Sequence, residues 1–139
     1  MSVKSISFEV KTSGQTDILD ITNKVRKEVS SSGMVNGTVT VFIPGSTAGV
    51  TTIEYESGVV NDLKKAIEKL APAGIHYDHD SRWGDGNGYS HVRAALLGAS
   101  LSVPFNNGDL KLGAWQQIVL MDFDNRPRSR NILVQIVGE

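Results

Sequence analysis

Five stretches of the chain are dominated by β-branched and other apolar residues, and they restrict the fold to one built on a substantial β-sheet. The first, residues 3–10, mostly alternates apolar and polar side chains, which is the period of a strand buried on one face. The other four, rich in valine, isoleucine and leucine, are residues 38–44, 101–105, 115–123 and 130–138. We expect the last two strands in the middle of a sheet or at a subunit interface, with Trp115 packed in the core or in such an interface.

Helical spacing of apolar residues occurs between these strands. Ile18, Ile21, Val25 and Val29 predict a first helix with Asp17 as its N-cap. A second helix is expected to start at Ser57 and to end before Pro72, and a third to run from Ser90 to Gly98. With a further short strand at residues 51–55, the sequence predicts one β-rich α+β domain over residues 1–139, without internal repeats or a linker.

Composition excludes several classes of function. The chain has 139 residues and a formal net charge of -1, which lacks the basic surface that nonspecific nucleic-acid or acidic-membrane binding requires. No apolar run approaches the ~20 residues of a membrane span, and the alternating N-terminus does not resemble a signal peptide, so we expect a cytoplasmic protein. Because cysteine is absent, any bound metal must use histidine, aspartate or glutamate.

The stretch from residue 73 to residue 89 is long for a connection inside a compact domain, and such loops are usually functional. It holds His79, and His91 follows it in the third predicted helix. If the loop folds back, both imidazoles reach one pocket, where they can act as acid–base groups or metal ligands. The alternative is that each histidine is a satisfied structural residue, because their spacing is no metal signature.

An anion site is expected at the start of the third helix. Ser90 is its predicted N-cap, and the free N–H groups of a helix start attract negative charge. Arg93 in the first turn and Arg82 in the preceding loop add guanidinium groups suited to phosphate or carboxylate. Glycines at positions 84, 86 and 88 let the backbone approach a ligand. The alternative is that Arg93 pairs with a surface acid such as Asp85.

Three further residues surround the loop after the strand at 38–44. Ser46 and Thr47 can donate hydroxyl and amide hydrogen bonds to the same ligand, or simply form a polar turn. Glu54, between Ile53 and Tyr55, is a candidate base or metal ligand if it is partly desolvated. Its alternative is an outward-facing strand residue.

Three segments together resemble one known family. VFIPGSTAGVTTIEYE, HDSRWGDGNGYSHVRAALLG followed by LSVPF, and LGAWQQIVLMDFDNRPR are similar to the YjbQ family, often labelled secondary thiamine-phosphate synthase enzyme. The resemblance covers nearly the whole chain and favours the branch with Gly-Ser-Thr at residues 45–47. It implies an α+β fold, a homotrimer, and a site near the subunit boundary with histidines and often a bound metal or anion.

By position, the resemblance assigns His79 and His91 to the recurrent histidines of the family and Glu54 to its recurrent acid. Members often have histidine where this chain has Gly45, Gly84 and Tyr89, so a site with three histidines does not carry over. The family label implies that a hydroxymethylpyrimidine diphosphate joins a thiazole phosphate and releases pyrophosphate. A reaction of this kind needs a stabilised leaving group, to which arginines, helix amides and a divalent zinc or magnesium ion can contribute.

The sequence therefore predicts a small trimeric enzyme that acts on a phosphorylated or anionic metabolite, with no organic cofactor. Its predicted catalytic residues are His79, His91 and Glu54, and its predicted anion-binding residues are Arg93, Arg82, Ser90, Ser46 and Thr47. His79 and His91 are the predicted metal ligands. The competing hypotheses are a trimer that binds a metal or anion without chemistry, and a purely structural role. Several long apolar strands with only three modest helices also favour an oligomer, since one chain leaves sheet surface uncovered.

Overall fold

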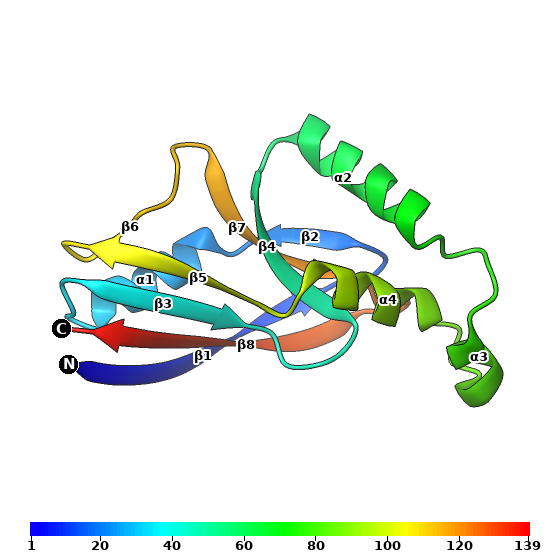
Figure 1. Ribbon diagram of the computed structural model, residues 1–139, viewed down its shortest axis with the longest axis horizontal. Helices are drawn as coiled ribbons and strands as arrows, with labels where there is room; N and C mark the ends of the chain where they lie inside the picture. Colours follow the sequence, from blue (N-terminus) through cyan, green and yellow to red (C-terminus); the bar gives the residue numbers. More distant parts are fainter.

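The computed structural model describes residues 1–139 and contains two antiparallel sheets and four helices (Figure 1). The five-stranded sheet has the order β1-β8-β3-β5-β6, and the three-stranded sheet has the order β2-β7-β4. The strands are β1 (Ser2–Thr12), β2 (Asp17–Asp20), β3 (Gly37–Phe42), β4 (Ala48–Glu54), β5 (Ser100–Asn106), β6 (Asp109–Leu110), β7 (Gln116–Asp122) and β8 (Arg128–Gly138). The helices are α1 (Thr22–Ser31), α2 (Ser57–Leu70), α3 (Asp78–Trp83) and α4 (Gly88–Leu97). The predicted α+β class is confirmed.

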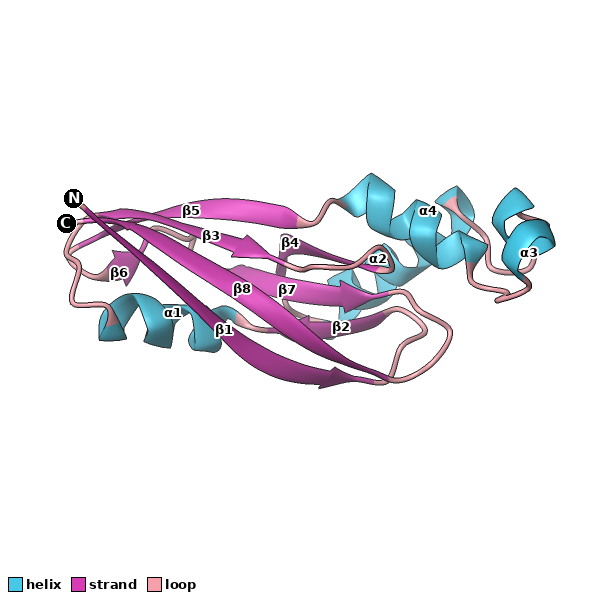
Figure 2. Cartoon of the chain, turned by 90° about the horizontal axis from the view of Figure 1, so that it is seen from below, coloured by secondary structure: helices cyan, strands magenta, loops and turns pink.

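The core has two layers because β7 is buried on both faces. Ile118 and Leu120 pack with α1 and with the inner face of the five-stranded sheet, where Ile132, Val134 and Ile136 of β8 are buried. On its other face, Val119 and Met121 pack with Ile67 of α2 and Ala94 of α4. Residues that alternate along one strand therefore serve two cores, and the prediction that β7 and β8 lie inside sheets is confirmed. Figure 2 shows α1 at one end of the molecule and the other helices at the opposite end.

The first predicted helix starts too early. Residues 17–20 form β2, which pairs with β7 and places Ile18 opposite Met121. Asp17 is therefore not the N-cap of α1; instead Oδ1 of Asp20 accepts hydrogen bonds from N and Oγ1 of Thr22. The sequence pattern predicted helix here because Ile18 continues the helical spacing of the buried residues in α1.

Three other details differ from the sequence-based expectation. The stretch at residues 73–89 contains α3, and α4 begins at Gly88 instead of Ser90. Trp115 is 76% exposed, so it is not a core residue of this chain.

None of the helices combines the length and apolar character needed to cross a membrane.

The end of α4 lies unusually close to β4. The N–H of Val50 donates to the carbonyl oxygen of Gly98 over 3.1 Å. A Cβ atom at Gly49 would lie 2.6 Å from that same oxygen, so only glycine permits this approach. The contact fixes α4 against the start of β4 and thereby sets the position of His91 relative to the loop at residues 43–47.

Candidate functional site

His79 and His91 are brought together as the sequence predicts. His79 comes from α3 and His91 from the first half of α4, and their ring centroids are 4.4 Å apart with an angle of 38° between the planes. The Nδ1 atom of His79 is buried and has no hydrogen-bond partner, and the nearest acid is Oδ1 of Asp80 at 3.6 Å. The turn between α3 and α4 therefore creates an imidazole pair with an unused polar atom, which is uncommon unless the atom has a functional role.

His91 also lines a cleft of about 370 Å3 beside the loop that leads into β4. The loop contributes Gly45 and Ser46, and α4 contributes small residues such as Ala94 and Ala95. The backbone N–H groups of Gly45, Ser46 and Thr47 donate to no acceptor within the chain. Gly45 has a φ of +118°, a conformation that favours glycine. The N–H groups of Gly45 and Ser46, which line the cleft, are therefore available to an anion bound there.

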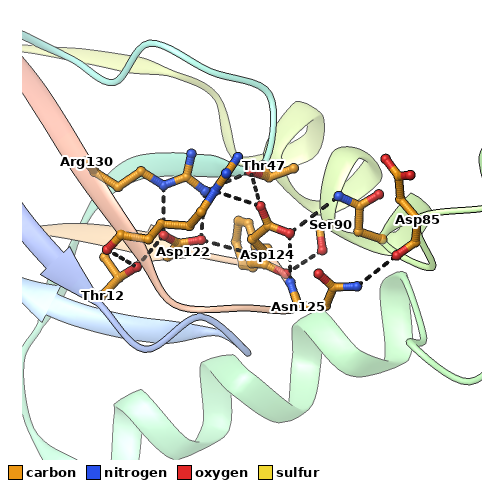
Figure 3. Close-up of polar contacts among 11 residues, drawn as sticks. Thr12, Thr47, Asp85, Ser90, Asp122, Asp124, Asn125 and Arg130 are labelled. Carbon is orange, nitrogen blue, oxygen red and sulfur yellow. Dashed lines mark hydrogen bonds and ion pairs between the residues drawn. The ribbon is translucent and has the colours of Figure 1, made fainter. Parts of the chain in front are cut away.

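A buried polar network lies behind this loop (Figure 3). Arg130 of β8 binds Asp122 of β7 through two hydrogen bonds of 2.8 Å, and its Nη2 also donates to Oγ1 of Thr47 over 2.7 Å. Thr12 donates to Asp122 over 2.6 Å. Next to this pair, Asp124 accepts from the N–H of Asn125 and lies 3.0 Å from Nε of Arg128. The network joins β1, β7, β8 and the loop into one rigid unit.

Both aspartates remain charged in this environment. Burial by itself would raise the pKa of Asp122, but hydrogen bonds from Arg130, Thr12 and the N–H of Asp124 outweigh it and hold the pKa below its ordinary value. Burial likewise opposes ionisation of Asp124, and the N–H of Asn125, the Asn87 amide and the charge of Arg128 keep its pKa low. The network therefore presents ion pairs, not neutral acids, beneath the loop.

The predicted anion site at the start of α4 is already occupied by the protein. Oδ1 of Asp80 accepts a 2.9 Å hydrogen bond from the N–H of Gly88, so a carboxylate from α3 caps the helix. Ser90 is not the N-cap: its side chain is buried and its hydroxyl donates to the carbonyl oxygen of Phe123. Thr47 is also buried, and its hydroxyl is used by Arg130 and Asp124, so this hydroxyl is not available to a ligand.

Arg93 lies differently from the sequence-based expectation. Its side chain is 5% exposed and points between α2 and the loop at residues 13–16. It donates to the carbonyl oxygen of Ala71 over 2.9 Å, to Thr16 over 2.8 Å and to Glu68, and it stacks on the Tyr89 ring. Because these protein partners take up the guanidinium, we do not include Arg93 in the proposed anion site.

Arg82 and Glu54 do not join the imidazole pair: Arg82 stacks on Trp83, and Glu54 lies at the far end of β4. Arg82 is exposed on α3, with its guanidinium 5.4 Å from the ring centroid of Trp83. Glu54 ends β4, whereas the loop precedes Ala48 at the other end of the same strand, so about 20 Å of strand separates them. Glu54 instead lines a separate cleft with Asp20 and Trp115. Within one chain, Glu54 and His91 therefore belong to different surfaces.

The residues present do not fit a zinc or magnesium centre supplied by one chain. No group of three or more histidine, cysteine, aspartate or glutamate side chains comes together, and the imidazole pair alone offers two donors. Gly45 brings no side chain into the cleft. We therefore assign no step to a metal ion.

Sequence reasoning missed Asp122, Asp124 and Arg130. A signal was available: DFDNRPRSR puts charged residues directly at the ends of two buried strands. Acids at such a position usually belong to an exposed turn. Only the pairing of β7 and β8 with their neighbours shows that both acids are buried.

The fold and this site define a small α+β protein in which two sheets and two helices hold an imidazole pair beside a loop anchored by a buried Arg–Asp pair. The chain belongs to the YjbQ-like UPF0047 family, whose model, described as "UPF0047 protein YjbQ-like", matches residues 6–139. A UPF0047 protein of Methanothermobacter thermautotrophicus is 37% identical over 139 residues, which is 100% of this chain and 95% of the relative.

Solved structures agree with the family assignment. A hypothetical protein of Aeropyrum pernix K1 superposes with a TM-score of 0.91 at 33% identity, over 98% of this chain and 99% of that one. A protein of unknown function from Sulfolobus solfataricus P2 gives a TM-score of 0.90 at 31% identity, over 99% and 100% of the two chains. The family is thus one whose function is not established, and the site itself must supply the functional argument.

Proposed function

We propose that this protein is a small enzyme that acts on a phosphorylated or otherwise anionic metabolite, with His91 as its acid–base residue. The observation that carries the proposal is the imidazole pair at 4.4 Å, with His91 lining a cleft whose other wall has free backbone N–H groups. An imidazole gives and takes protons near neutral pH, and free N–H groups stabilise negative charge on a bound group.

The residues have separate roles in this proposal. The N–H groups of Gly45 and Ser46 and the exposed Ser46 hydroxyl hold the anionic group, and His91 exchanges a proton with the reacting atom. His79 packs against His91 and orients its ring, so we regard His79 as a positioning residue. The resemblance to the family label makes condensation of a pyrimidine diphosphate with a thiazole phosphate the first reaction to assay.

Replacement of His91 with alanine is expected to lower turnover at least about 100-fold, since general acid–base groups contribute on that order. Pyrophosphate release from the two phosphorylated substrates is the measurement. His76→Ala is the matched control, because His76 is 71% exposed and lies outside the imidazole pair. Wild-type turnover in His91→Ala, with an unchanged thermal unfolding profile, would contradict the acid–base role.

The second candidate function is an anion-binding protein without catalysis. It is favoured by the free N–H groups of Gly45 and Ser46, which need only bind. Saturable binding of a phosphorylated metabolite to wild-type protein, with no product formed over prolonged incubation, would select this function. In that case His91→Ala weakens binding and no turnover is measured for either variant.

The assembly that we propose is a homotrimer, the number three coming from the family resemblance. The outer face of the five-stranded sheet supports self-association, because its outward residues on β3, β5 and β8 carry no charge. Phe42 and Leu133 lie opposite each other there and are 41% and 44% exposed. Protein interfaces are depleted in charged residues in this way.

We expect a mass in solution of three times the 15.0 kDa of one chain, measured by light scattering after size-exclusion chromatography. Leu133→Lys is expected to shift the protein towards monomer, because a lysine cannot be buried unpaired. Leu70→Lys is the control, since Leu70 is 69% exposed at the end of α2. A monomeric wild-type protein would refute the assembly.

A further inference from the structure

A groove of about 590 Å3 lies beside the β7–β8 connection, on the Pro44 side of the loop that carries Gly45. No hydrophobic residue lines it apart from the prolines at 44 and 127, and three of its seven lining residues are Arg126, Arg128 and Arg130. Three guanidinium groups therefore gather on one concave surface, although the formal net charge of the chain is -1. The groove lies outside the cleft of His91.

Much of the donor capacity of these arginines is unused. Arg130 is 6% exposed, and its Nε and Nη2 atoms bind Asp122 and Thr47, but Nη1 has no partner. In Figure 3 one amino group of Arg130 accordingly bears no dashed line. A Cβ atom at Gly45 would lie 3.3 Å from Nη1, so this donor reaches the loop backbone. Nη1 is open to solvent in the groove, so it is available to an acceptor that binds there.

The other two arginines extend the same donor surface. Arg126 is exposed and makes no ion pair or hydrogen bond through its side chain, and Arg128 uses only Nε, on Asp124. Two aspartates oppose three arginines, which leaves one net positive charge. The neighbouring edge strand β1 adds Lys11 and Glu9, whose charges cancel. The groove therefore favours an anion with several acceptor oxygens.

The groove is also preorganised. The N–H of Gln15 donates to the carbonyl oxygen of Asp124 over 2.7 Å, and a Cβ atom at Gly14 would lie 2.5 Å from the carbonyl oxygen of Arg126. The β1–β2 loop thus packs directly on the backbone that carries Arg126. A rigid wall reduces the entropy lost when a ligand binds.

We propose that this groove binds a phosphate group, held by Arg126 and the free Nη1 of Arg130, and so anchors a small phosphate monoester. The several oxygens of phosphate match the forked donors of arginine better than a monatomic anion such as chloride does. A small metabolite is favoured over nucleic acid because the basic surface is confined to one connection between strands. Since Gly45 borders both Nη1 and the cleft of His91, this anchor deepens the proposed function by naming a phosphate monoester as its ligand.

The test is a titration of the assembled protein with inorganic phosphate, followed by NMR at constant ionic strength against chloride. We expect the Nε–H resonance of Arg130 and the backbone resonances of residues 126–130 to shift in a saturable way at millimolar phosphate. Arg126→Gln is expected to weaken this binding about tenfold, as loss of charge-assisted hydrogen bonds would. Arg26→Gln is the control with the same change in charge, on an exposed arginine of α1.

Two results would overturn the anchor: no saturable shift at these residues, or equal weakening by Arg126→Gln and Arg26→Gln, which would indicate a general charge effect. The acid–base proposal has a separate outcome. His91→Ala is expected to keep phosphate binding in the groove while it loses turnover. Loss of turnover with intact groove binding supports both proposals, and intact groove binding with unaffected turnover refutes only the role of His91.

Discussion

Replacement of Asp122 with asparagine is expected to lower the free energy of unfolding by about 3 to 5 kcal/mol, because it leaves a buried guanidinium without its counterion. The side chain of Asp122 is 0% exposed and that of Arg130 is 6% exposed, so most of the remaining charge is shielded from water. Chemical denaturation of both proteins at neutral pH measures the difference.

Asp109→Asn is the matched control. Asp109 is 70% exposed and lies 3.8 Å from Arg26, and exposed pairs of this kind contribute at most about 1 kcal/mol. The double variant Asp122→Asn, Arg130→Gln is expected to recover part of the loss, since no unpaired charge is left. If Asp122→Asn costs no more than Asp109→Asn, the pair does not support the loop.

The stability difference between wild type and Asp122→Asn is expected to depend on pH. The pKa of Asp122 is lowered in the folded protein, so its contribution to stability is fully present above the pKa of about 3.9 in the unfolded chain. This contribution is lost as the pH falls through the lower folded-state pKa. We therefore expect the stability difference between wild type and Asp122→Asn to shrink with acidification below about pH 4.

Replacement of Arg93 with leucine is expected to cost about 3 kcal/mol of folding stability and to leave phosphate affinity unchanged. Leucine fills part of the volume but cannot donate to the carbonyl oxygen of Ala71 or to the hydroxyl of Thr16, and hydrogen bonds from a charged group contribute about 1.5 to 3 kcal/mol each. Glu68 adds less, because its side chain is 55% exposed.

Thermal and chemical unfolding measure this loss, and phosphate titration of the folded protein measures affinity. Arg82→Leu is the control, since an exposed substitution away from such contacts changes stability by about 0.5 kcal/mol or less. A variant of Arg93 with normal stability and weakened phosphate binding would restore the anion-binding role that the sequence predicts.

The elements that the sequence predicts well are those with strong local signals. β7 and β8 are recognisable because their runs of valine, isoleucine and leucine suit buried strands of a sheet. β2 was not predicted, because it has only four residues and its buried Ile18 continues the helical spacing of α1. α3 was not predicted, because its six residues have no apolar stripe and therefore show no helical period.

The candidate site likewise has features that the sequence predicts and features that it does not. The meeting of His79 and His91 was predictable, since a loop that returns to the helix leaves few other places for them. The direction of Arg93 was not, because its acceptors Ala71 and Thr16 are 22 and 77 positions away in the chain. A first-turn arginine on a helix looks the same in the sequence whether it faces a ligand or the core.

By itself, the sequence determined the α+β class, the positions of most strands and the segment that holds both histidines, because hydrophobic period and composition are local properties. Only the tertiary structure decided that Asp80 caps α4, that Arg93 is enclosed and that Asp122 pairs with Arg130. It also separated Glu54 from the histidines along β4. These features depend on which distant segments share a low-dielectric environment, where each buried charge must find a partner, and local sequence does not specify that partner.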